Sequence, residues 1–99
     1  MLTITKKTEN ETSTFTLEGR LDTSTATDLE NEIKDSLSGI NELIFDFEKL
    51  DYISSSGLRV LLLAQKIMLK QGNMCIINVN DDVKEIFELT GFSDIMDIK

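Results

Sequence analysis

Three consecutive serines and a glycine, Ser54–Gly57, are the residues whose types and spacing best suit chemistry in this chain. They stand between an apolar segment and a long run of leucine, isoleucine and methionine. Small hydroxyl side chains cap helices at such boundaries, because their oxygens accept from the free N–H groups of the first turn. That turn also carries the positive end of the helix dipole and suits a phosphate, either attached or bound. Capping alone and phosphate chemistry both explain the serines.

Catalysis by these serines is disfavoured by the rest of the composition. The sequence contains no histidine, which removes the usual general base and the usual partner of a nucleophilic serine. It has neither a Gly-x-Ser-x-Gly elbow nor the Gly-x-x-x-x-Gly-Lys-Ser/Thr loop that binds nucleotides. We therefore predict no catalytic residues, no enzymatic activity and no cofactor.

Metal and thiol chemistry have little support. Asp22, Asp46 and Asp51 are conceivable magnesium ligands, but scattered carboxylates are common in an acidic chain, and Asp22 is better explained as a helix cap. The single cysteine, Cys75, excludes an internal disulfide, and its apolar neighbours predict a place in the core. We predict no metal site.

Eighteen acidic residues against ten basic ones give the chain a net charge of −8. Such a surface repels nucleic-acid phosphates and anionic membranes, so we expect no direct nucleic-acid binding. The charge suits a protein partner with a basic face, or it only maintains solubility. No apolar run has the length of a membrane span and the N-terminus lacks signal-peptide features, so we expect a cytoplasmic protein without membrane insertion.

The remaining sequence predicts strands and helices in alternation. Apolar periodicity indicates strands at residues 2–8, 13–20, 42–47 and 74–79. Helical spacing indicates a first helix behind residues 21–25 that ends near Gly39, a second from about Gly57 to Gln71, and a third capped by Asp81 and Asp82 that ends at Gly91. Residues 92–98 fit either an edge strand or a last helical turn. In the third helix we expect the inward side chains to be Val83, Ile86, Phe87 and Leu89.

These elements predict one α/β domain over residues 1–99. Their order is β-β-α-β-α-β-α-(β/α), and strands joined through one helix should be parallel. We expect a mixed four- to five-stranded sheet with about three to four helices, mainly on one face. The chain is long enough for one core of this kind.

The second helix is apolar over more than half of its circumference. Its core face should consist of Leu58, Leu61, Leu62, Met68 and Leu69. A basic stripe of Arg59, Lys66 and Lys70 lies opposite, with Leu63 and Ile67 beside it and Val60 at the border. An apolar flank on a surface helix favours a docking face for another protein, unless neighbouring helices cover Leu63 and Ile67.

Several stretches together resemble STAS domains, and above all the free-standing bacterial anti-sigma factor antagonists. The resemblance rests on residues 19–26 (Gly-Arg-Leu-Asp-Thr-Ser-Thr-Ala), 52–58 (Tyr-Ile-Ser-Ser-Ser-Gly-Leu), the turn at Gly72, and 83–92 (Val-Lys-Glu-Ile-Phe-Glu-Leu-Thr-Gly-Phe). Their order and spacing match over almost the whole chain. The serine–glycine motif combined with the last helix is the specific part.

The resemblance implies a regulatory function. Members of that family bind an anti-sigma factor that is also a serine kinase, which frees a sigma factor for transcription, and phosphorylation of a serine before the second helix abolishes binding. Counting from Gly57, the resemblance implies phosphorylation at Ser55, with Ser54 and Ser56 less favoured; Ser54 replaces the aspartate common in the family. We expect a monomer or weak dimer whose partner contacts are Asp22, Thr23, Ser54, Ser55, Ser56, Gly57, Arg59, Val60, Leu63 and Ile67.

Two other functions are compatible with the same residues. STAS-like domains also occur as constitutive scaffold subunits of transport or stress-signalling complexes. The backbone amides of residues 54–57 offer a third reading, a small-ligand or nucleotide site, although no specificity motif supports it.

Overall fold

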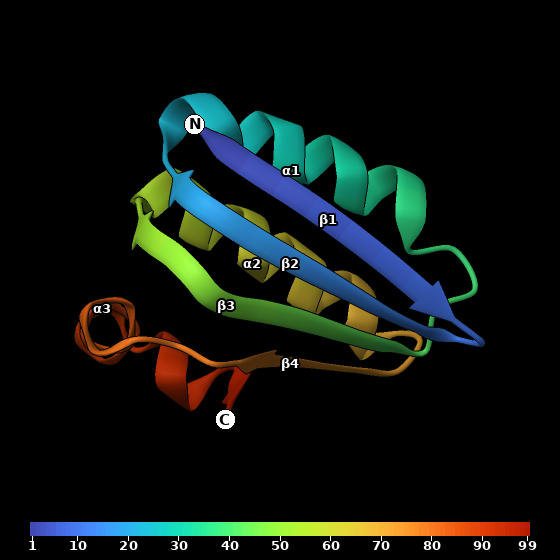
Figure 1. The fold of residues 1–99 in the computed structure, drawn as a ribbon. Helices are drawn as coiled ribbons and strands as arrows, with labels where there is room; N and C mark the ends of the chain where they lie inside the picture. The colour runs from blue at the N-terminus through green and yellow to red at the C-terminus, as the bar shows by residue number, and fades with distance from the viewer.

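The protein, described by a computed structural model over residues 1–99, forms one five-stranded mixed sheet with three helices (Figure 1). The elements in chain order are β1 (Leu2–Glu9), β2 (Thr12–Leu21), α1 (Thr23–Ser36), β3 (Glu42–Ile53), α2 (Ser55–Leu69), β4 (Asn73–Ile77), α3 (Asp81–Thr90), a short 3-10 turn (Phe92–Asp94) and β5 (Asp97–Ile98). The strand order is β1-β2-β3-β4-β5; β1 is antiparallel to β2 and the other pairs are parallel. The predicted fold class and element order are confirmed, and residues 92–98 contain both the helical turn and the strand.

The core lies between the sheet and the helices. Alternate residues of β2 and β3 point inward; in Figure 1 α2 lies behind these strands and α1 lies along the β1 edge of the sheet. Four phenylalanine rings form a continuous series across this inner face. Phe15 and Phe45 lie 5.7 Å apart, Phe45 and Phe47 5.9 Å, and Phe47 stacks on Phe87 of α3 at 6.3 Å. The stack attaches α3 to the same inner face as the other two helices, as expected.

Strand β3 is twice as long as predicted, because it contains two irregularities that break the alternation. Its pairing with β2 shifts register after Asp46 and again after Leu50, so β3 has an extra residue at each place. As a result Phe47, Leu50 and Ile53 all face the core, three residues apart. A bulge adds a residue and increases the local twist. A spacing of three residues does not match the two-residue period of a strand, so the alternation of apolar and polar residues stops at Phe47.

Three predictions about helix faces and ends were wrong. Asn80, and not Asp81 or Asp82, caps α3: its Oδ1 accepts from the Val83 N–H at 2.9 Å, and the two aspartates occupy the first turn. Leu69 is 72% exposed, because it is the last residue of α2. Leu89 is 79% exposed; at 100° per residue it lies about 160° from Phe87, on the outer side of α3.

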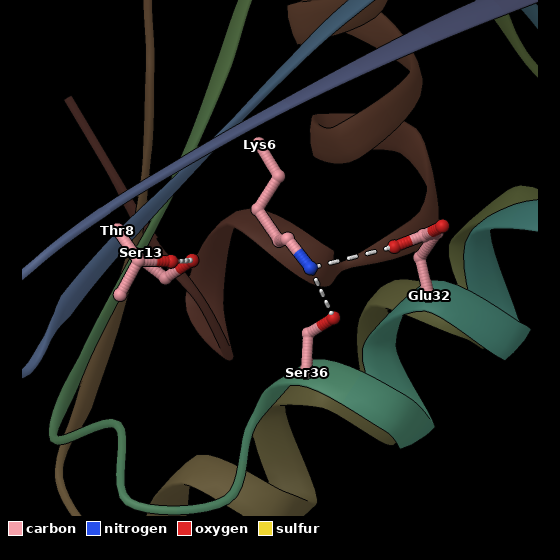
Figure 2. A network of polar contacts seen from close by, with 5 residues as sticks. All are labelled: Lys6, Thr8, Ser13, Glu32 and Ser36. Atoms are coloured by element: carbon pink, nitrogen blue, oxygen red, sulfur yellow. Dashed lines mark hydrogen bonds and ion pairs between the residues drawn. The ribbon is translucent and has the colours of Figure 1, made fainter.

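Edge strand β1 is tied to α1 by a lysine on its inner face (Figure 2). Lys6 Nζ donates to Ser36 Oγ at 2.8 Å and lies 3.8 Å from Glu32 Oε2. Nearby, the hydroxyls of Thr8 and Ser13 lie 3.2 Å apart across β1 and β2. An inward-pointing charge on an edge strand opposes pairing with another chain. The apolar core therefore ends before this half of β1.

Replacing Gln71 by alanine should lower the free energy of unfolding by about 1–2 kcal/mol. Its Nε2 donates to the carbonyls of Leu37 at 2.6 Å and Ile40 at 2.5 Å, in the connection from α1 to β3. Urea denaturation measures the loss. Gln65→Met is the matched control, because Gln65 Oε1 is buried without a partner, and this variant should be as stable as wild type or slightly more so. Equal losses of unfolding free energy in both variants would contradict a stabilising role for the hydrogen bonds of Gln71.

Candidate functional site

Helices α1 and α2 begin side by side at the carboxyl ends of the parallel strands β2 and β3. The last strand residues are Leu21 and Ile53, and the Ser54 N–H donates to the Leu21 carbonyl at 2.9 Å. The hydroxyls of Thr23 and Ser56, one from each helix, lie 3.4 Å apart. Two helix N-termini, each with the positive end of its dipole, therefore share one edge of the sheet.

Asp22 organises the start of α1, as predicted. Its Oδ1 accepts from the backbone N–H groups of Ser24 at 3.0 Å and Thr25 at 3.1 Å, and its own N–H donates to Thr25 Oγ1 at 2.9 Å. The Ser24 hydroxyl adds a bond of 2.8 Å to the same oxygen. These bonds, led by that of the Ser24 hydroxyl, favour the charged carboxylate and lower the pKa of Asp22. Asp22 is thus a cap whose charge is already satisfied.

Asp22→Asn should remove a pH-dependent part of the stability. Because the pKa is lowered in the folded protein, the carboxylate stabilises the fold above the ordinary pKa of about 3.9, and this contribution is lost as the pH falls through the lowered value. Asparagine also caps helices, so the variant isolates the charge. Urea denaturation between neutral and acidic pH should show wild type more stable at pH 7 and the difference closing below pH 4. A difference that stays constant with pH would contradict this assignment.

The three serines at the start of α2 have different environments. Ser54 is the N-cap, with its Oγ accepting from the Gly57 N–H at 3.3 Å. Ser56 is half-buried and contacts Thr23. Ser55 is the first residue of the helix, is exposed, and its hydroxyl has no partner in the protein. Of the three hydroxyls, only that of Ser55 is both on an exposed residue and without a hydrogen-bond partner in the protein.

Gly57 allows α2 to begin in close contact with the sheet. A Cβ at this position would lie 2.7 Å from Leu21 Cγ and 2.9 Å from Ile53 Cγ1, closer than carbon atoms pack. Leu21 and Ile53 are buried strand residues that cannot give way easily. The glycine therefore fixes how near the serines lie to the ends of β2 and β3.

The outer face of the sheet carries an aromatic–cation pair at the same edge. Arg20 and Tyr52 are opposite each other in the pairing of β2 with β3, and the guanidinium carbon lies 4.3 Å from the centre of the Tyr52 ring. Neither residue was predicted as part of the site. The signal was available in the sequence, because each residue directly precedes the inward residue that ends its strand. Such a contact orients the Arg20 charge beside the site.

Comparisons with known proteins agree with this geometry. The family model described as STAS domain matches residues 3–99. The chain belongs to the STAS domain family. A provisionally named anti-sigma factor antagonist of Bordetella bronchiseptica, BtrV, is 36% identical over 84 residues, which cover 83% of this chain and 72% of BtrV.

Solved structures of STAS proteins share the fold at low sequence identity. An anti-sigma factor antagonist from Mycobacterium paratuberculosis has a TM-score of 0.90 at 19% identity, over 99% of this chain and 85% of that one. The Bacillus protein SpoIIAA in its phosphorylated form has a TM-score of 0.77 at 20% identity, over 98% and 91%. Unphosphorylated SpoIIAA has the same TM-score, 0.77, at 18% identity, over 98% and 87%.

Some of the expected contact residues in this STAS domain are not accessible. Val60 is 4% exposed and belongs to the core, and Gly57 is buried under the start of α2, so neither offers surface to a partner. Thr23 and Arg59 are exposed, and Asp22 is half-buried. The accessible part of the expected surface thus begins at the two helix N-termini and continues along α2.

The flank of α2 is partly covered. Leu63 and Ile67 are half-buried; Leu63 lines shallow grooves on either side of the helix, and Ile67 lines one of these grooves and also packs against the core. Neither of the two interpretations made from the sequence, full exposure or full cover, describes them. The flank is a shallow apolar surface with basic residues around it.

Cys75 lies outside the core, contrary to the prediction. It is half-buried on the outer face of β4, because Met74 and Ile76 take the inward positions. Burial raises the pKa of its thiol, with Lys99 acting in the opposite direction. No three acidic or cysteine side chains gather as a metal site would require, and none of the helices combines the length and hydropathy of a membrane span.

Proposed function

We propose that this STAS domain is an anti-sigma factor antagonist that binds an anti-sigma factor kinase and is switched off by phosphorylation of Ser55. The observation that carries the proposal is an exposed, unpartnered serine hydroxyl at the first position of α2. The name of the relative BtrV supports the same class. The domain acts in the cytoplasm, without catalytic activity of its own and as a monomer or weak dimer, and regulates transcription through its partner.

Ser55 suits a kinase better than its neighbours do. A kinase must reach the hydroxyl, and Ser54 and Ser56 are both half-buried and engaged with Gly57 and Thr23. The Ser54 hydroxyl oxygen is also occupied as the N-cap, where it accepts from the Gly57 N–H. The reaction transfers the terminal phosphoryl group of ATP to Ser55 Oγ, with release of ADP and of the hydroxyl proton.

Phosphorylation would change the surface and leave the fold intact. It adds about −1.5 to −2 charges at the helix start, where the dipole tolerates them. SpoIIAA, which has been solved in both forms, is equally similar to this chain in each, with TM-scores of 0.77. This supports a switch that acts through bulk and charge at the interface.

Mapping the phosphosite tests the proposal. The purified protein is incubated with ATP and the anti-sigma factor kinase of its source organism, and the modified residue is located by mass spectrometry. We expect wild type and Ser56→Ala to take up one phosphate at Ser55, and Ser55→Ala to take up none. Undiminished phosphorylation of Ser55→Ala would refute the site. Kinase binding without any phosphorylation would instead favour the constitutive scaffold.

A further inference from the structure

One exposed side of α2 carries basic and apolar residues in succession. This α2 stripe consists of Arg59, Leu63, Lys66, Ile67 and Lys70, at positions i, i+4, i+7, i+8 and i+11 of one helix face. The stripe is about 17 Å long at the helical rise of 1.5 Å per residue. The three basic residues are exposed and the two apolar residues are half-buried.

Two shallow grooves flank the α2 stripe. One, of about 310 Å³, lies between the two helices and is lined by Arg59, Leu62, Leu63 and Lys66 of α2 and by Glu30 and Lys34 of α1, which pair with each other. The other, of about 550 Å³, lies along the C-terminal half of α2 and is lined by Leu63, Lys66, Ile67 and Lys70, with Leu69 and Gln71. Together they give a partly apolar floor along which the basic residues outnumber the one acidic residue, Glu30.

The basic residues of the α2 stripe form no ion pair within the protein, although Glu30 lines the same groove as Arg59 and Lys66. Residues 52–80 contain no aspartate or glutamate, although the chain has eighteen acidic residues. None of Arg59, Lys66 and Lys70 takes part in the ion pairs of the structure. The helix dipole explains cations near the end of α2, but it does not favour Arg59 near the start. The stripe is therefore a basic surface on an otherwise acidic protein.

We propose that the α2 stripe docks an acidic amphipathic helix of a protein partner. Carboxylates of that helix pair with Arg59, Lys66 and Lys70, and its apolar side chains enter the grooves beside Leu63 and Ile67. Helices commonly bind in this way, and complementary charge selects the partner and speeds association. The inference deepens the proposed function, on which it rests for the existence of a protein partner, by giving that partner's chemistry.

An anionic membrane is the other surface that a basic amphipathic helix fits. Here α1 lies beside α2 (Figure 1), with Asp28 and Asp35 exposed and Glu30 lining the groove between the two helices. A flat bilayer that reached the α2 stripe would approach these carboxylates as well, and the net charge of −8 adds to the repulsion. A single helix, about 10 Å wide, can occupy α2 and the groove beside it without covering the outer side of α1. The geometry thus favours the protein helix.

A synthetic peptide tests the inference without the kinase. The probe is a fluorescent helical peptide of about 18 residues, long enough to span the stripe, with leucines on one face and glutamates beside them. Fluorescence anisotropy should show saturable binding that weakens with salt. Lys66→Glu/Lys70→Glu should reduce the affinity at least about tenfold. The control Lys49→Glu/Lys84→Glu, with the same change in net charge at exposed lysines elsewhere, should bind like wild type.

Four outcomes of the binding measurements would overturn the inference, and so would one outcome in sedimentation. The first is the absence of saturable binding, and the second is equal affinity for a peptide with lysine in place of glutamate. The third is an equal loss of peptide affinity in the two double variants. The fourth is preferential binding of phosphatidylglycerol vesicles that Lys66→Glu/Lys70→Glu abolishes. A wild-type dimer in sedimentation that this variant dissociates would assign the stripe to a second copy and overturn it too. Failure of phosphorylation at Ser55 would leave the peptide result unchanged, so the two proposals fail separately.

Discussion

Ser55→Asp is expected to weaken binding to the anti-sigma factor about a hundredfold, or about 2.8 kcal/mol. The residue is exposed at the first position of α2, so the new carboxylate enters the interface without disturbing the core. A charge buried in an interface without a partner costs several kcal/mol. Arg59 lies one turn further on the same helix face, where aspartate would also reduce the positive potential offered to the partner.

Two variants control this experiment, which is read by calorimetric titration. Ser55→Ala should bind within about threefold of wild type, because it removes a hydroxyl without adding charge. Ser38→Asp introduces the same charge at an exposed serine in the connection after α1, at the far end from the two helix starts, and should bind like wild type. Undiminished binding by Ser55→Asp would refute the switch.

Gly57→Val should lower the free energy of unfolding by about 2–3 kcal/mol, as for other overpacked sites. The first added carbon already falls 2.7 Å from Leu21 Cγ, and valine adds two methyl groups between α2 and the strands. The helix start must move away from the sheet, which displaces Ser55. In thermal denaturation the midpoint should fall by about 10 °C for a domain of this size.

Valine placed two residues earlier, at Ser55, separates the effect of packing from that of helix propensity. Ser55→Val places valine on the exposed side of the first turn and should change the stability by no more than about 0.5 kcal/mol. If Gly57→Val were as stable as Ser55→Val, the close approach of α2 to Leu21 and Ile53 would not be what requires the glycine.

The sequence predicted elements with a regular period, and failed where the period changed. The strand before the serines ended too early in the prediction because the bulges in β3 place Phe47, Leu50 and Ile53 three residues apart on the core face. Leu69 is exposed for a different reason. Leu69 lies on the helix side that faces the core, but it is the last residue of α2 and is exposed. Periodicity does not show where the core that covers this side of the helix ends.

The site was predicted by residue type, and its geometry was not. Asp22 and the serines were identified from their residue types, because helix capping involves only a side chain and the backbone N–H groups of the next few residues. Which serine is free depends on the contact between Thr23 and Ser56, thirty-three positions apart, and Val60 was misplaced because its cover comes from other elements. The pairing of Arg20 with Tyr52 likewise depends on strand register, which the sequence alone did not specify.

The most direct test of the account compares two forms of the same protein against the anti-sigma factor. Unmodified protein and protein phosphorylated stoichiometrically at Ser55 are each titrated with the anti-sigma factor in a calorimeter. We predict tight binding by the unmodified form and an affinity at least about a hundredfold lower for the phosphorylated form, restored by phosphatase treatment. Equal affinities for the two forms would contradict it.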